Sequence, residues 1–207
     1  MLRFETFPTG LISANCVLVW DPQQGTGVVV DPGDEAGRIC KQVEALGFKV
    51  TALLQTHAHF DHLGAAKELQ DRWHCPVFLH PADNYLVETL DMQTGLFGMK
   101  SVPAPTTTEL NPGDVHHGLK TLHTPGHTPG SCCFFGDFEQ GQVVLSGDTL
   151  FQGGVGRTDL LGGRWDQLEA SIQRELYTLD DRTLVIPGHG AMTTIGAEAE
   201  KNAFVKR

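Results

Sequence analysis

A run of potential metal ligands directly after an apolar strand is the feature that most constrains how this chain can fold. Residues 50–55 form a short apolar run that predicts a strand, and a helix is expected from about residue 63 to 72. Between them stand His57, His59, Asp61 and His62. Packing cannot explain four such groups within six residues, because His and Asp are poor core residues. Strand ends in α/β layers are where side chains converge on a crevice, so the run predicts an α/β protein with a metal site at a strand end.

The chemistry of this run favours more than one metal ion. His and carboxylate ligands without cysteine suit zinc, iron or manganese. His57 and His59 are two residues apart and are expected on one side of the turn, whereas Asp61 and His62 are expected to point elsewhere. A tight turn cannot bring all four groups around one ion, so the spacing predicts two adjacent ions.

Three further loops each place a potential ligand after an apolar strand. His127 stands at the centre of Thr124–Gly130, a loop in which Pro fixes the backbone and Gly permits close approach, which favours a ligand over a surface histidine. Asp148 follows the run 143–146; taken alone it reads as an N-cap or turn residue, although its two oxygens could bridge two ions. His189 lies in Pro187–Gly190, after another apolar run. The repetition of the pattern is more informative than any one motif.

The order of the predicted elements indicates the architecture. Strands come first, then strands alternating with helices, then strands, and finally a helix over 165–179 and a strand over 183–186. A chain of 207 residues can bury a sizeable core, and no linker or repeat interrupts it. We expect one mixed α/β domain over residues 1–207, with helices covering two sheets. Residues 91–106 show no clean period and are expected to form a surface loop.

The composition of the chain restricts the binding partners and the cellular compartment that are expected for the protein. With 15 Lys and Arg against 25 Asp and Glu, the formal net charge is −10, which argues against binding nucleic acid or an anionic membrane. No apolar run could span a bilayer, and the start does not resemble a signal peptide. The five cysteines contain no C-x-x-C pair, so reduced thiols in a cytoplasmic protein are expected. We expect a monomer that acts on a small molecule.

Taken together, the four motifs resemble those of the metallo-β-lactamase superfamily, in that family's order and over about residues 2–205. FQGGVGRTDL (Phe151–Leu160) and the tail TTIGAEAEKNAF are similar to the glyoxalase II group, the hydroxyacylglutathione hydrolases, in its short bacterial form without the C-terminal helical extension. The resemblance implies a four-layer αβ/βα sandwich with the metal site at one edge of the sheets.

The resemblance also implies a ligand set and an activity. One ion would take His57, His59 and His127, the other Asp61, His62 and His189, and Asp148 would bridge them. The ions would be divalent, with zinc expected first and iron or manganese as alternatives. The implied reaction is hydrolysis of S-D-lactoylglutathione, or a related hydroxyacylglutathione, to glutathione and a 2-hydroxy acid by a metal-bridging hydroxide, as in methylglyoxal detoxification. Asp61 and Asp148 would be the catalytic carboxylates.

Substrate contacts and competing functions stay open at this point. Arg157 and Lys100 are candidates for binding an anionic part of the substrate, although Arg157 could instead form a structural pair with Asp159. A mononuclear-iron persulfide dioxygenase, a lactonase-like hydrolase of the same fold and a metal-binding module without catalysis are the alternative functions. Oxygen uptake, a panel of substrates and the metal content would separate them.

Overall fold

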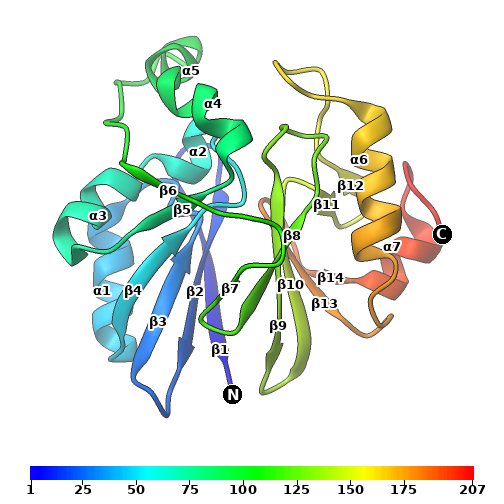
Figure 1. The fold of residues 1–207 in the computed structure, drawn as a ribbon, viewed down its shortest axis with the longest axis horizontal. Coiled ribbons are helices and arrows are strands. Elements are labelled where there is room, and N and C mark those ends of the chain that lie inside the picture. Colours follow the sequence, from blue (N-terminus) through cyan, green and yellow to red (C-terminus); the bar gives the residue numbers. More distant parts are fainter. The chain divides into compact units, whose positions relative to one another are not determined.

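The computed structural model describes residues 1–207 as two compact units, Met1–Leu110 and Asn111–Arg207. Each unit is built around its own six-stranded mixed sheet with helices packed against it (Figure 1). The mixed α/β composition expected from the alternation of apolar runs and helical periods is present in both units.

The first sheet has the strand order β1-β2-β3-β4-β5-β6. Its strands are β1 (Arg3–Thr9), β2 (Ala14–Asp21), β3 (Thr26–Val30), β4 (Lys49–Leu54), β5 (Val77–Leu79) and β6 (Thr107–Glu109). The first three strands pair antiparallel, and β3 to β6 pair parallel. Because β3 and β4 run in the same direction, the loops that follow them open at the same edge of the sheet.

Helices of the first unit connect and cover these strands. They are α1 (Ala36–Leu46), α2 (Phe60–Leu63), α3 (Ala66–Trp73), the 3-10 turn η1 (Pro81–Asp83), α4 (Asn84–Glu88) and α5 (Leu90–Leu96). The apolar face of α1 is buried and Gly47 ends the helix in a left-handed conformation, as its period and final glycine predict. Figure 1 shows α1 and α3 beside β3 and β4.

The second sheet has the order β14-β13-β10-β9-β8-β7. Its strands are β7 (Val115–His116), β8 (Leu119–His123), β9 (Cys132–Phe138), β10 (Gly141–Gly147), β13 (Leu184–Pro187) and β14 (Thr193–Thr194). A separate hairpin pairs β11 (Leu150–Phe151) with β12 (Gly154–Val155). β8, β9 and β10 are successively antiparallel and β13 is parallel to β10, so β8, β10 and β13 all end at the same edge.

Three helical segments pack in the second unit: α6 (Trp165–Ser171), the π-helical turn η2 (Ile172–Leu176) and α7 (Ile195–Lys201). Leu168, Ile172 and Leu176 are fully buried in one apolar cluster with Val144 and Val185. The helix predicted for 165–179 is therefore confirmed at these positions. Its first and last parts differ from the prediction, because Trp165 is 40% exposed and the amide of Tyr177 bonds the Ile172 carbonyl to close a π turn.

The prediction of a surface loop over 91–106 is wrong in its first part, where α5 forms a helix. Only Leu90 and Thr94 of α5 are buried, whereas Met92 and Leu96 are exposed. Apolar side chains on the solvent face therefore hide the helical period that the buried pair would otherwise reveal.

The cysteines of the chain all lie in its interior. All five cysteines are buried thiols outside any disulfide. Burial raises the pKa of the Cys16 thiol far above its ordinary value, so this thiol stays protonated. None of the helices has the length and apolar character needed to cross a bilayer.

Glu198 on α7 provides a test of how the C-terminal helix is held. Its carboxylate is buried and accepts hydrogen bonds from the Gly153 amide (2.8 Å), the Thr193 hydroxyl (2.7 Å) and the Asn202 side-chain amide (2.8 Å). Glu198→Ala leaves these donors without their acceptor, so we expect a loss of about 3 kcal/mol in the free energy of unfolding, measured by urea denaturation. Glu200→Ala, on the exposed face of the same helix, is the control and should cost less than about 0.5 kcal/mol. Equal costs would contradict this role.

Candidate metal centre

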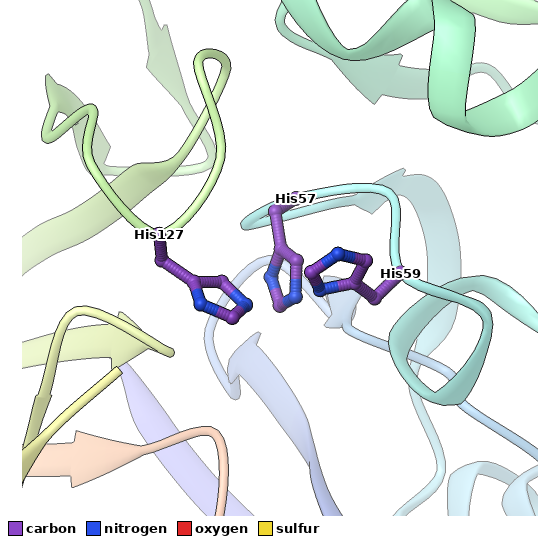
Figure 2. Close-up of side chains that lie close together, drawn as sticks. All are labelled: His57, His59 and His127. Carbon is purple, nitrogen blue, oxygen red and sulfur yellow. The ribbon is translucent and has the colours of Figure 1, made fainter. Parts of the chain in front are cut away.

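The four predicted ligands of the first unit lie together in the loop after β4 and the start of α2. The His57 ring is 4.8 Å from the His59 ring and 4.2 Å from the His62 ring, between centroids. His62 Nε2 is 3.6 Å from Asp61 Oδ2. His57 and His62 are buried, whereas His59 and Asp61 are partly exposed. Figure 2 shows His57 and His59 projecting from this loop with their rings edge to face.

Side chains from three other segments hold the backbone of this loop. Every second amide of the loop donates to a side-chain oxygen, and the acceptors are Asp31 Oδ1 for Thr56 (2.7 Å), Asp83 Oδ2 for Ala58 (3.2 Å) and Gln93 Oε1 for Phe60 (3.0 Å). A loop whose amides are satisfied in this way keeps its side chains in position before any ligand binds.

Asp31 is the main anchor of the loop and was not among the predicted site residues. It follows β3, is 2% exposed and has a φ of 49°, a left-handed conformation uncommon for a residue with a side chain. Its Oδ2 accepts hydrogen bonds from the Thr56 hydroxyl (2.6 Å) and from His62 Nδ1 (2.9 Å). The available signal was an acidic residue directly after an apolar run, as at Asp148.

These contacts determine which ring nitrogen carries the proton. A carboxylate only accepts, so His62 Nδ1 donates to Asp31 and Nε2 keeps the lone pair that a metal needs. The Thr56 hydroxyl gives its one proton to Asp31, so it must accept from His57 Nδ1 at 3.1 Å. Asp31 therefore sets the same tautomer in both histidines, directly in His62 and through Thr56 in His57.

The second unit gathers its three predicted ligands at the common end of β8, β10 and β13. Asp148 Oδ2 lies 3.6 Å from His127 Nε2 and 3.7 Å from His189 Nε2. His127 Nδ1 donates to the Arg157 carbonyl oxygen at 2.7 Å, so Nε2 again keeps the lone pair. Figure 2 shows His127 at the end of the loop after β8. One carboxylate oxygen near two imidazoles is an arrangement suited to sharing a metal site.

The donor set fits a metal centre of the kind the sequence predicts. Imidazole nitrogens and carboxylate oxygens are the ligands that zinc, iron and manganese accept in proteins. In His57, His62 and His127, the nitrogen bearing the lone pair is Nε2, as hydrogen bonds at Nδ1 typically arrange for ligating histidines.

A glycine packs against the backbone of an aspartate in each unit. A Cβ on Gly33 would lie 1.8 Å from the Asp61 carbonyl oxygen, and a Cβ on Gly156 would lie 1.8 Å from the Asp148 carbonyl oxygen. Neither position has room for any side chain, so the motif glycine Gly156 is explained by close packing.

The two candidates for substrate binding lie outside these clusters. The Arg157 guanidinium bonds both oxygens of Asp159, at 2.7 and 2.9 Å, which confirms the expected structural pair. The hydrogen bond from Arg157 holds the pKa of the Asp159 carboxyl below its ordinary value. Lys100 is exposed on the segment after α5. For both Arg157 and Lys100, a contact with the substrate stays a prediction.

Comparison with known proteins identifies relatives of this chain. A family model described as the metallo-beta-lactamase superfamily matches residues 9–189. "Probable metallo-hydrolase YqgX" of Bacillus subtilis (strain 168) is 38% identical, over 99% of this chain and 98% of that protein. "Hydroxyacylglutathione hydrolase GloC" of Haemophilus influenzae (strain ATCC 51907 / DSM 11121 / KW20 / Rd) is 36% identical, over 99% of this chain and 98% of that protein.

A solved structure supports the fold and broadens the choice of metal. The crystal structure titled TTHA1623 in a di-iron-bound form is 38% identical, with a TM-score of 0.88 over 97% of this chain and all of that one. The predicted metallo-β-lactamase fold is thereby confirmed, whereas the iron in that relative means that zinc is not established for this chain. On its sequence, its fold and its donor set, the chain belongs to the metallo-β-lactamase superfamily as a metallo-hydrolase.

Proposed function

We propose that this metallo-hydrolase is a thioesterase that converts S-D-lactoylglutathione, or a related hydroxyacylglutathione, to glutathione and a 2-hydroxy acid. The observation that carries the proposal is the gathering of imidazoles and carboxylates at one sheet edge within each unit. Similarity along nearly the whole chain to a protein named hydroxyacylglutathione hydrolase supports the choice of substrate.

In this proposal the seven candidate ligands hold two divalent ions. His57, His59 and His127 would bind one ion, Asp61, His62 and His189 the other, and Asp148 would lie between them. Each of these two sets would offer three ligand atoms of the kinds that bind one such ion. These donors bind zinc, iron or manganese, so they indicate two divalent ions without selecting one element.

The residues of the chain would have distinct tasks in hydrolysis. Bound divalent ions lower the pKa of water to near 7 and stabilise a developing oxyanion, which is the chemistry they would supply here. Asp61 would orient the attacking water, and the Asp148 carboxylate would contribute to binding both ions. Asp31 and the Arg157 carbonyl hold the protons on the ring atoms that face away from the site. A thiolate leaves without prior protonation, so a separate general acid is not required.

An anaerobic thioesterase assay tests the proposal directly. We expect metal-loaded protein to release glutathione and D-lactate in equal amounts from S-D-lactoylglutathione, at a rate that oxygen does not change. Elemental analysis of the same sample should give about two ions per chain, as expected for a two-metal site.

The alternative functions define the contrary outcomes. Oxygen uptake with sulfite release from glutathione persulfide, together with one iron per chain, would favour the persulfide dioxygenase. Faster turnover of lactones or of a β-lactam would show that the enzyme acts on another class of substrate with the same fold. Metal-replete protein that is inert toward all of these would leave only a binding module.

Asp148→Asn tests the role of the shared carboxylate. An amide keeps the shape but loses the charge that would hold two cations, so we expect metal content to fall and kcat/KM for the thioester to drop by at least about 100-fold. His116→Ala, a histidine in β7 outside both clusters, is the control and should change kcat/KM less than about twofold. Similar losses in both variants would contradict the role of Asp148.

Asp31→Asn tests the anchor behind the ligands. The new amide nitrogen would face the Thr56 hydroxyl and His62 Nδ1, both of which donate to Asp31, so the tautomers are no longer imposed. We expect metal affinity, measured by competition with a chromophoric chelator, to weaken about 10- to 100-fold. Saturating metal should restore most of kcat. Asp71→Asn on the exposed face of α3 should bind metal like the parent, and an unchanged affinity in Asp31→Asn would overturn the assignment.

A further inference from the structure

We propose that a shallow apolar pocket in the first unit, beside Asp61, binds the side chain of the substrate's acyl group and makes the enzyme prefer longer 2-hydroxyacyl thioesters to the lactoyl thioester. This inference rests on the proposed thioesterase function and specifies its substrate class.

The apolar side chains of the pocket come from three segments that are distant in sequence. Leu11 and Ile12 lie in the turn between β1 and β2, Phe60 begins α2, and Met99 and Val102 follow α5. All five side chains are hydrocarbon or thioether, so the surface they offer favours an apolar group.

Parts of this wall are held in place by the core. Ile12, Met99 and Val102 are partly buried and pack against the apolar cluster of the first unit. The Met99 amide donates to the Thr94 carbonyl of α5 at 3.0 Å, which fixes the chain as it leaves the helix. Phe60 is buried in the same cluster and its ring lies 5.0 Å from that of Phe97. The pocket is therefore largely formed before a substrate binds.

Charge decides which part of a thioester suits this pocket. Its ionisable lining groups are Asp34 and Asp61, and no Lys, Arg or His side chain lines it. The exposed Asp34 carboxylate repels the carboxylates of glutathione and no cationic side chain of the lining attracts them, whereas an alkyl chain carries no charge to repel. The acyl side chain therefore fits the lining better than the thiol portion does.

Position links the pocket to the reaction. Asp61 is both a lining residue and a ligand in the proposed metal centre. A group seated in the pocket would thus lie next to Asp61, the residue whose carboxylate is proposed to orient the attacking water. The acyl substituent is the part of the substrate attached directly to the carbon under attack.

A matched series of glutathione thioesters tests the inference on the intact metal-loaded protein. The lactoyl, 2-hydroxybutanoyl and 2-hydroxyhexanoyl thioesters differ only in the length of the acyl chain. We expect kcat/KM to rise about two- to fourfold per added methylene group. Met99→Ser and Leu11→Ser should each lower the ratio of the hexanoyl to the lactoyl value toward one; Leu11 is 75% exposed, so its replacement does not threaten folding. Met92→Ser, an exposed methionine of α5 outside the pocket, should keep the parental ratio.

The outcomes separate this inference from the function on which it rests. Hydrolysis with a flat or falling series in the parent protein would overturn the apolar pocket and leave the thioesterase standing. A rising series that survives both pocket variants would also overturn it. If no member of the series is hydrolysed, the thioesterase function fails and this inference fails with it.

Discussion

An imidazole can bind a metal only through a nitrogen that carries a lone pair. In this structure, hydrogen bonds at Nδ1 leave that lone pair on Nε2 of three candidate ligands. The Asp31 carboxylate takes the Nδ1 proton of His62 directly and orients His57 through the Thr56 hydroxyl. The Arg157 carbonyl does the same for His127. The Asp31 contacts exist because the parallel strands β3 and β4 deliver their loops to one edge, so the topology of the first sheet is the precondition for the ligand arrangement of the first unit.

Local pattern was enough to predict the elements that position the site. The apolar runs before His57, His127, Asp148 and His189 are β4, β8, β10 and β13, and the ligand motifs follow them as expected. Asp31 was missed because its importance lies in contacts about 25 to 31 residues away along the chain, which periodicity cannot reveal. The helix α5 was missed because its exposed face is apolar. Two compact units emerge from the contacts, and their union into one domain stays a prediction.

The segment around α5 takes part in two different features of the first unit. Gln93 holds the Phe60 amide and so helps to shape the ligand loop, whereas Met99 and Val102 line the pocket a few residues later. In the proposed thioesterase, one short stretch of chain would thus contribute both to preorganisation of the site and to recognition of the substrate. Substrate preference can change there through side chains that face the pocket, while the hydrogen bond that supports the loop is kept.

Gly33 and Gly156 carry no functional group, yet a Cβ at either position would overlap the carbonyl of an aspartate ligand candidate. In a saturation mutagenesis experiment on this enzyme, both glycines would therefore tolerate substitution as poorly as the candidate histidine ligands do. Ranking positions by intolerance alone would place two chemically inert residues within the apparent active site. Only a separate measurement of abundance for each variant would distinguish a lost reaction from a lost backbone packing.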